Sequence, residues 1–305
     1  MKKKFSNSPK IIKKYLKFIK SQEITGQPFI DKLGQLNNYY IPISNMIYKK
    51  YMKNKKTTIL GLSGGQGTGK STISNILRII LKEKFNLETV IFSIDDFYKK
   101  LKERKKMSKN INKLFLTRGV PGTHDTKMLF NCLNRLKKKN FKKILIPKFD
   151  KSIDDRYNKN KWTKVLKKPN IVIFEGWCVG ARPQKNSSLI KPINPLESLE
   201  DRNLIWRKRI NYELKNNYKK IFNLIDILIF LKVPSFKYVY KWRLLQEKKL
   251  KKISKGKKIM SNKQIKRFVM FYERITRQML KTSNFFSKVL INIDTRHCLK
   301  SIKFN

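Results

Sequence analysis

The 305-residue chain contains few acidic residues, few cysteines and little glycine or proline. Its three cysteines, Cys132, Cys178 and Cys298, are too few and too scattered for a disulfide framework or a zinc site, so we expect a reducing compartment, the cytoplasm. With 12 glycines and 10 prolines, the chain is neither collagen-like nor of low complexity. No apolar run approaches the roughly 20 residues that span a bilayer, so the sequence predicts no transmembrane segment.

The shortage of acidic side chains leaves a large excess of positive charge. There are 73 Lys and Arg residues against 20 Asp and Glu, a net charge of +53 at pH 7. Such a chain could bind nucleic acid or an anionic membrane, because basic side chains displace counterions from polyanions. An AT-rich genome would produce the same excess, since codons made of A and T encode lysine, asparagine and isoleucine. Because the lysines are spread along the whole chain, we expect no specific nucleic-acid partner, and the sequence indicates no oligomeric state.

The apolar residues are sufficient for a sizeable core, since hydrophobic residues make up 40% of the chain. We expect two parts: a basic N-terminal helical extension, residues 1–56, and one domain, residues 57–305. Apolar residues between Ile11 and Ile19 follow the spacing of a short amphipathic helix. That helix could lie on a membrane surface, bind RNA or pack on the main domain, and packing is the simplest of the three interpretations.

From Thr57 onward, short apolar runs alternate with stretches of helical periodicity. The runs have the texture of buried parallel strands: Thr58–Leu62, Thr89–Ile94, Ile144–Ile146, Ile171–Phe174, Ile227–Leu231 and Val289–Ile293. The helical stretches lie between them: Ser71–Lys84, Thr126–Lys138, Leu196–Phe222, Ser235–Lys251 and Ser261–Lys281. This alternation predicts an α/β fold with a doubly wound, mostly parallel sheet and helices on both faces.

A glycine-rich segment follows the first predicted strand and fits the pattern G-x-x-x-x-G-K-[ST] of a phosphate-binding loop, the P-loop. Backbone N–H groups of such a loop converge on phosphate oxygens, and the helix that follows adds positive potential. We expect Lys70 to bridge the β- and γ-phosphates of ATP and the Ser71 hydroxyl to bind Mg²⁺. The nucleotide-binding set is Gly64, Gly65, Gln66, Gly67, Thr68, Gly69, Lys70, Ser71 and Thr72. The sequence thus predicts the fold of the P-loop nucleoside triphosphate hydrolases and kinases.

Acidic residues follow two of the predicted strands. Asp95 and Asp96 come after the second strand, at the carboxyl end where ligands of open α/β sheets bind. One of them could accept the proton of an attacking hydroxyl, or both could serve as turn and cap residues. Glu175 ends the strand that begins at Ile171 and could hold Mg²⁺ directly or through water.

Two loops and one helix carry candidate substrate contacts. Arg118, His124 and Asp125 lie within eight residues and could grip an anionic or hydroxylated substrate, although Asp125 could equally cap a helix. The segment Pro147–Ser152 with Arg156 has a similar character. Arg243 begins a basic helix and could reach over the phosphates, or simply face solvent.

Together these segments resemble the D-glycerate 3-kinase-like branch of the P-loop kinases, which is related to uridine kinases, pantothenate kinases and phosphoribulokinases. The matching segments occur in family order from about Thr57 to Asp294: the loop 65–71, Ser93–Tyr98, Arg118–Asp125, Pro147–Ser152, Phe174–Trp177 and Pro234–Leu244. The resemblance implies ATP as donor, Mg²⁺ as cofactor and a small hydroxyl-bearing acceptor. By the same analogy, Asp95 rather than Asp96 is the base.

We therefore expect an ATP-dependent kinase that phosphorylates a hydroxyl group of D-glycerate. In this interpretation Lys70, Asp95 and Arg243 are catalytic, Ser71 and Glu175 bind the metal, and Arg118, His124, Asp125 and Arg156 bind the substrate. The lysine-rich segment 99–112 and the short segment 153–164 would shape the acceptor pocket, so a uridine, pantothenate or sugar-phosphate acceptor stays open. A different class of function is also open: a basic nucleic-acid-binding regulator that retains a nucleotide site.

Overall fold

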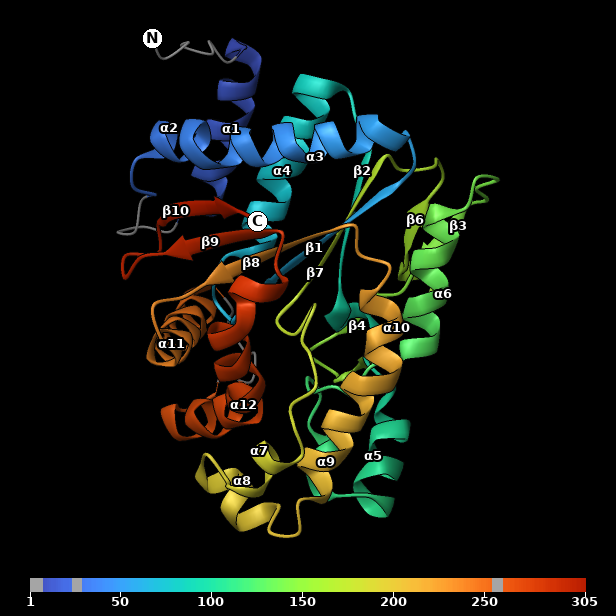
Figure 1. Cartoon of the computed structure of the whole chain (residues 1–305), viewed down its shortest axis with the longest axis vertical. Helices are drawn as coiled ribbons and strands as arrows, with labels where there is room; N and C mark the ends of the chain where they lie inside the picture. The colour runs from blue at the N-terminus through green and yellow to red at the C-terminus, as the bar shows by residue number, and fades with distance from the viewer. Residues whose placement is uncertain (1–7, 24–28, 254–259) are drawn as a thin grey trace.

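The core of the protein is a six-stranded sheet with the strand order β10-β9-β8-β1-β7-β2 (Figure 1). The structure is a computed structural model and describes residues 8–23, 29–253 and 260–305. The strands of this sheet are β1 (Thr58–Gly64), β2 (Thr89–Ser93), β7 (Ile171–Gly176), β8 (Ile227–Lys232), β9 (Val289–Ile293) and β10 (Leu299–Phe304). All neighbouring pairs are parallel except β9 and β10, which are antiparallel.

The inner strands β1, β7, β8 and β9 are buried on both faces of the sheet, as continuous apolar strands require. In β7, Ile171 and Ile173 pack into one core cluster, whereas Val172 and Phe174 pack into the other. One face is covered by α1 (Pro9–Gln22), α3 (Ile41–Asn54), α4 (Lys70–Phe85) and α11 (Phe236–Ile253). The opposite face is covered by α6 (Thr126–Lys137), α9 (Ile205–Glu213), α10 (Lys219–Phe222) and α12 (Asn262–Phe286). The expected doubly wound α/β fold is confirmed.

Shorter elements connect these layers. They are α2 (Lys32–Gln35), α5 (Leu101–Asn110), α7 (Ser187–Ile190), α8 (Pro195–Glu200), the 3₁₀ turns η2 (Ile94–Phe97), η3 (Lys113–Leu116) and η4 (Lys159–Lys161), and the π turns η1 (Leu36–Tyr40) and η5 (Leu214–Tyr218). Among them, α5, α7 and α8 lie at the lower end of the molecule in Figure 1. Two small antiparallel ribbons lie outside the main sheet: β3 (Ile144–Ile146) with β6 (Thr163–Val165), and β4 (Phe149–Asp150) with β5 (Asp155–Arg156).

The N-terminal helices pack on the sheet domain. Ile11, Tyr15 and Ile19 of α1 are buried in the core cluster that contains the apolar side of α4. Farther along, the Gln35 side chain donates to the Leu299 carbonyl and accepts from the Leu299 N–H, both at 3.0 Å. Residues 1–56, where described, therefore contribute to the same core as the sheet, and a domain boundary near residue 57 stays a prediction.

Two expectations about individual elements are wrong, and one strand was missed. The run Ile144–Ile146 does not join the parallel sheet; it pairs antiparallel with β6 in a separate ribbon, and its central residue is exposed. The stretch Leu196–Phe222 is not one helix, because the Asp201 carboxylate accepts the backbone N–H groups of Trp206 and Arg207 and so starts a new helix after α8. The antiparallel edge strand β10 was not expected from the sequence.

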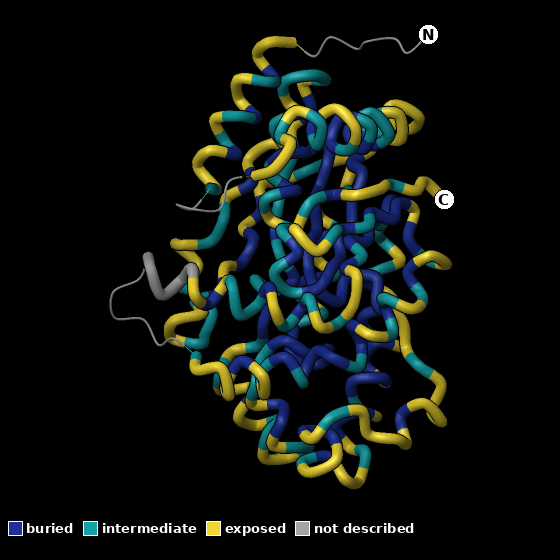
Figure 2. The backbone as a smooth tube through the Cα atoms, turned by 90° about the vertical axis from the view of Figure 1, so that its left-hand side faces the viewer, coloured by how far each residue is buried: buried dark blue, intermediate teal, exposed yellow. Residues whose placement is uncertain are grey.

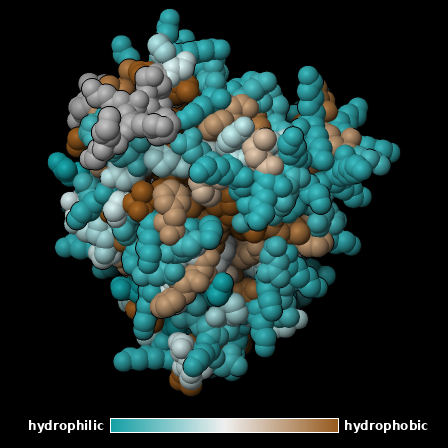
Figure 3. All heavy atoms as spheres, turned by 45° about the horizontal axis from the view of Figure 1, so that its top comes forward, coloured by the Kyte–Doolittle hydropathy of each residue, from teal (hydrophilic) through white to brown (hydrophobic). Residues whose placement is uncertain are grey.

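Exposed lysines occur on elements far apart in the chain, such as Lys13 of α1 and Lys105 of α5. The face shown in Figure 3 is mostly hydrophilic, with apolar side chains gathered near its middle. Buried residues concentrate along the strands in the centre of the molecule, and the outer side of α1 is exposed (Figure 2). Among the described residues, no helix combines the length and apolar character needed to cross a membrane.

Candidate active site

Three adjacent strands place the predicted nucleotide-binding, metal-binding and catalytic residues at one edge of the sheet. In the ladders, Glu175 of β7 is aligned with Leu62 of β1 on one side and with Ser93 of β2 on the other. The phosphate-binding loop follows β1, and Asp95 lies two residues beyond the end of β2. Because parallel strands end at the same edge, the loop, Glu175 and Asp95 are neighbours although about 80 residues separate the last two in sequence.

The phosphate-binding loop has the backbone conformation that its glycines allow. Gly67 and Gly69 have φ angles of 77° and 80°, in the left-handed region that glycine adopts without strain. The Thr68 hydroxyl donates to the Gly65 carbonyl at 2.8 Å and closes the turn. Nζ of Lys70 donates to the carbonyls of Gly64 and Gly65, both at 2.9 Å, so the ammonium lies across the mouth of the loop. Thr72 follows in the first turn of α4.

The predicted metal ligands contact each other. The Ser71 hydroxyl donates to Oε1 of Glu175 at 2.8 Å, whereas the buried Oε2 has no hydrogen-bond partner within the described ranges. Burial raises the pKa of Glu175, and the charge of Lys70 and the Ser71 hydrogen bond oppose this. A hydroxyl and a carboxylate with a spare oxygen form the hard donor set that Mg²⁺ prefers. These two residues therefore fit the metal.

Asp95 has a hydrogen-bond partner on each carboxylate oxygen. The Tyr98 hydroxyl donates to Oδ1 at 2.6 Å, and Nζ of Lys151 donates to Oδ2 at 2.9 Å. Burial alone would raise the pKa of Asp95, but the positive charge of Lys151 and these two hydrogen bonds lower it to about 2. Asp95 is therefore ionised throughout the physiological pH range.

Asp96 has a local role in the turn that follows β2. Its Oδ2 accepts the Ser93 N–H at 3.0 Å, and the Ser93 hydroxyl accepts the Asp95 N–H at 3.2 Å. These bonds form a capping box around the turn η2. The two adjacent carboxylates thus differ in surroundings, since Asp95 faces basic side chains and Asp96 satisfies the backbone.

The predicted substrate arginines are already engaged in ion pairs. Arg118 pairs with Asp154, and its guanidinium lies 5.4 Å from the centre of the Phe149 ring. Nη2 of Arg156 donates to the Tyr98 carbonyl at 2.8 Å and lies 3.4 Å from Oδ2 of Asp125. Both arginines therefore border the Asp95 region.

His124 and Asp125 occupy structural positions in this conformation. The His124 ring is fully buried and stacks on the Tyr98 ring with centroids 4.7 Å apart, while its Nδ1 lies 2.6 Å from the Tyr218 hydroxyl. Asp125 caps α6 by accepting the Met128 N–H at 3.0 Å, as the structural alternative anticipated. Contact of either residue with a substrate stays a prediction.

Arg243 lies near the phosphate-binding loop but pairs within its own helix. Its Nη2 is 2.7 Å from Oε2 of Glu247, one turn along α11, and its guanidinium lies over the Phe268 ring. The neighbouring residue, Trp242, packs against the loop so closely that a Cβ on Gly67 would come within 2.9 Å of its Cβ. A role over the phosphates requires Arg243 to leave Glu247.

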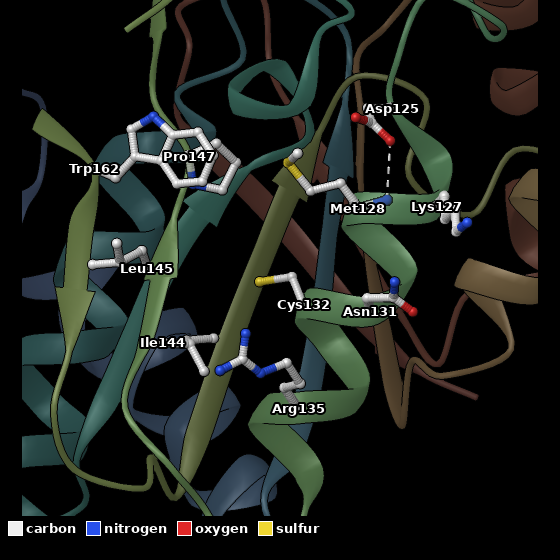
Figure 4. Close-up of a pocket in the computed structure, with 10 residues that line it drawn as sticks. All are labelled: Asp125, Lys127, Met128, Asn131, Cys132, Arg135, Ile144, Leu145, Pro147 and Trp162. Atoms are coloured by element: carbon white, nitrogen blue, oxygen red, sulfur yellow. Dashed lines mark hydrogen bonds between the residues drawn. The ribbon is translucent and has the colours of Figure 1, made fainter. Parts of the chain in front are cut away.

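A groove of about 370 Å³ opens between α6 and β3 (Figure 4). Met128 and Cys132 line it from α6, and Pro147 and Trp162 line it from the opposite side. Asp125 lies at one end of the groove and also contacts Arg156. Arg156 also donates to the backbone carbonyl of Tyr98, so it links the groove to the residue that binds Asp95.

Sequence reasoning did not single out Lys151, which binds Asp95, or Arg104, which binds Asp154 in the hairpin that carries Lys151. Lys151 lay within a suspected substrate segment without an assigned role, and it is one of many lysines in the chain. Arg104 lies in the lysine-rich α5, yet it is fully buried. The Asp-x-Phe-Tyr order did contain a usable signal for Tyr98, because three residues along a tight turn bring its hydroxyl back to Asp95.

Comparisons with known proteins agree with this geometry. The profile of the "Phosphoribulokinase / Uridine kinase family" matches residues 59–182. The protein named "Uncharacterized kinase mug58" from Schizosaccharomyces pombe is 37% identical over 253 residues, which cover 80% of this chain and 87% of that protein. The chloroplastic D-glycerate 3-kinase of Arabidopsis thaliana is 28% identical, with 80% of this chain aligned to 54% of that longer protein.

A solved structure shows the same fold. The D-glycerate 3-kinase from Cryptococcus neoformans var. grubii superposes with a TM-score of 0.75 at 22% sequence identity, and the match covers 87% of this chain and 99% of that one. At this identity the likeness concerns the fold.

Proposed function

This chain belongs to the D-glycerate 3-kinase-like P-loop kinases, within the phosphoribulokinase and uridine kinase family, and we propose that D-glycerate is its acceptor. The kinase activity follows from the family, and the acceptor is the proposal. The observation that carries it is the position of an ionised carboxylate, Asp95, among basic side chains beside the phosphate-binding loop. The cytoplasm, a reducing compartment, is the location that the scattered cysteines favour.

The donor in this proposal is ATP. The loop 64–69 would hold its phosphates with backbone N–H groups, and Lys70 would exchange its two carbonyl partners for β- and γ-phosphate oxygens. Ser71 and Glu175 would hold Mg²⁺, which neutralises phosphate charge when bound. Arg243 would add a further positive charge once it is released from Glu247.

Asp95 would bind the acceptor hydroxyl. As the oxygen of that hydroxyl forms its bond to the γ-phosphorus, the bond to the β,γ-bridging oxygen breaks, ADP leaves with the electron pair, and the hydroxyl proton passes to Asp95. A carboxylate with a pKa of about 2 is a weak base, so its main contribution is to orient the hydroxyl. Positioning is also what a loose phosphoryl-transfer transition state needs most.

The basic side chains around Asp95 suit an acceptor that carries a carboxylate. Arg118, Lys151 and Arg156 lie on this side of the site, and an arginine can bind a carboxylate through two parallel hydrogen bonds. A glycerate carboxylate would bind the remaining N–H donors of Arg118 and Arg156, which would keep their pairs with Asp154 and Asp125. His124, which stacks on Tyr98, and Asp125, which pairs with Arg156, would then hold these side chains in position.

An acceptor panel tests the proposal. The purified protein is incubated with ATP labelled in the γ-phosphate, Mg²⁺, and glycerate, uridine, pantothenate or a sugar phosphate. We expect label to pass to glycerate, and we expect Lys70→Ala to abolish this transfer because it removes the phosphate-bridging cation. Transfer to another acceptor with none to glycerate would overturn the assignment.

The groove beside α6 favours a larger acceptor as a second candidate. Its volume of about 370 Å³ and its apolar lining from Met128, Pro147 and Trp162 exceed what a three-carbon acid needs. Uridine or pantothenate could place a tail there while its hydroxyl reaches Asp95. Selective loss of turnover in Met128→Trp, which fills the groove, would support that candidate, whereas glycerate turnover should be unaffected.

A further inference from the structure

We propose that Lys151 is a positioning residue for the Asp95 carboxylate, and that Asp154, held between Arg104 and Arg118, fixes the hairpin that carries Lys151. The inference rests on the proposed function in one respect, namely that Asp95 binds the acceptor hydroxyl. Each step below concerns contacts among residues of this chain.

The first step is the geometry of the carboxylate itself. Tyr98 binds Oδ1 at 2.6 Å and Lys151 binds Oδ2 at 2.9 Å, so rotation of the carboxylate would break at least one of these bonds. An exposed ion pair normally contributes little to stability, and the Lys151 side chain is 61% exposed. Its contribution is therefore better sought in the orientation and charge of Asp95 than in folding.

The second step is the hairpin. Strands β4 and β5 pair Phe149 with Arg156 and are joined by the four residues 151–154. At one end of this turn, the Asp150 carboxylate accepts the Ser152 N–H at 2.9 Å. From β5, Arg156 reaches the Tyr98 carbonyl at 2.8 Å. One hairpin thus holds both the lysine on Asp95 and the backbone of the tyrosine on Asp95.

The third step is the clamp at the other end of the turn. Asp154 has a φ of 58°, a strained conformation for a residue with a side chain. Nη2 of Arg104 lies 3.0 Å from Oδ2 of Asp154 and donates to the Asp154 carbonyl at 2.6 Å, while Arg118 binds Oδ1. Both guanidinium groups also lie over the Phe149 ring, at 6.0 and 5.4 Å. Two cations on one carboxylate fix the turn.

Arg104 is unusual because its whole side chain is buried. Besides Asp154, it donates to the carbonyls of Lys99 at 3.2 Å and Leu116 at 2.7 Å. Burial of a charge has a high desolvation free energy, which is offset only when the buried donors have hydrogen-bond partners. The lysine-rich α5 therefore contributes one cation to the interior, and that cation anchors the hairpin.

Several ionisable groups influence the pKa of Asp95, and among them Lys151 lowers it most. Lys70 from α4 and His124 before α6 lie on the same side, and Glu175 from β7 adds negative charge. The remaining neighbours are Asp96, Tyr98, Tyr272 and Cys178. Burial favours the protonated acid, so removal of the Lys151 charge should raise the pKa of Asp95.

The kinetic test compares Lys151→Met, Lys151→Arg and the control Lys159→Met, which removes an exposed lysine just beyond the hairpin. We expect Lys151→Met to lower kcat about 100-fold with little change in the KM for ATP, because hydroxyl orientation is lost. The acid limb of its kcat profile should move to higher pH. Lys151→Arg should recover much of the rate, and Lys159→Met should resemble the wild type.

Asp154→Asn tests the clamp and should reproduce the kcat loss and the pH shift in a weaker form. If that variant does not fold, Asp154→Glu keeps the charge but displaces the carboxylate by one methylene, and should show the same pattern. A wild-type kcat and pH profile in a folded Asp154 variant would overturn the clamp.

A measurement without turnover separates this inference from the choice of acceptor. The carboxyl ¹³C resonance of Asp95, assigned by its absence in Asp95→Asn, is followed against pH. We expect an upward shift of its titration in Lys151→Met but not in Lys159→Met. If the wild type phosphorylates no acceptor, the proposed function fails while this titration still decides the pairing. Unchanged Asp95 titration in Lys151→Met, or a kcat within about twofold of the control, overturns the role of Lys151.

Discussion

The buried imidazole of His124 should make folding stability depend on pH. Burial lowers the pKa of His124 from 6.5 to about 4 in the folded protein. In the unfolded chain the ring is hydrated and regains its ordinary pKa of about 6.5. Above pH 6.5 the neutral ring therefore does not lower the free energy of unfolding. As the pH falls from 6.5 toward 4, the free energy of unfolding decreases, because the unfolded state then binds a proton that the folded state does not.

The difference between the two pKa values corresponds to about 3 kcal/mol, of which about 2 kcal/mol is already lost at pH 5. That is a large part of the roughly 5–15 kcal/mol by which a folded domain is stable. The charge of Asp95 favours the protonated ring but does not outweigh burial. The Nε2 atom is buried without a hydrogen bond in the part of the chain described here, so no acceptor stabilises a proton there.

Urea unfolding followed by circular dichroism between pH 4.5 and 7.5 measures this dependence. The matched variant is His124→Asn, which does not titrate but can retain a hydrogen bond to Tyr218. Glu175 and Asp96 have raised pKa values and change stability in the opposite direction at low pH, so the informative quantity is the difference between the two proteins. If wild type and variant lose stability equally from pH 7 to 5, the buried neutral imidazole is not the cause.

Three further substitutions test the site and the core. Asp95→Asn should retain nucleotide binding in a calorimetric titration but lose transfer by about 100-fold or more, and near-normal turnover would contradict its assigned role. Gly119→Ala should cost at least about 2 kcal/mol in urea unfolding, because φ is 128° and the new Cβ would lie 2.2 Å from the Tyr272 hydroxyl. Ile19→Ala should cost about 3 kcal/mol, since this side chain is fully buried on the inner face of α1, whereas the exposed Lys17→Ala should cost almost nothing.

The central sheet could be predicted because its inner strands are buried on both faces and therefore read as unbroken apolar runs. The phosphate-binding loop and Glu175 could be predicted for a related reason, since each follows directly from a strand end. Strand β10 gave no such signal, because only Leu299 of its six residues is buried. A strand at the edge of a sheet needs backbone partners rather than apolar side chains.

The contact between Lys151 and Asp95 could not be predicted, for a different reason. It joins residues 56 positions apart in sequence, and it depends on a four-residue turn whose shape is set by Asp154, Arg104 and Arg118. Arg104 is the one arginine among the lysines of α5, but nothing in the local sequence identifies Asp154 as its partner. Tertiary packing, not composition, decides which cation enters the site.

The double hydrogen bond between Gln35 and Leu299 has a consequence for biosynthesis. These residues are 264 positions apart, so the early segment emerges from the ribosome long before its partner strand exists. Until then β9 is the edge of the sheet without its partner β10, and the Gln35 amide can form hydrogen bonds only with water. We expect a nascent polypeptide stalled before residue 299 to be digested by protease within the region around Gln35, and one extended past that strand to resist.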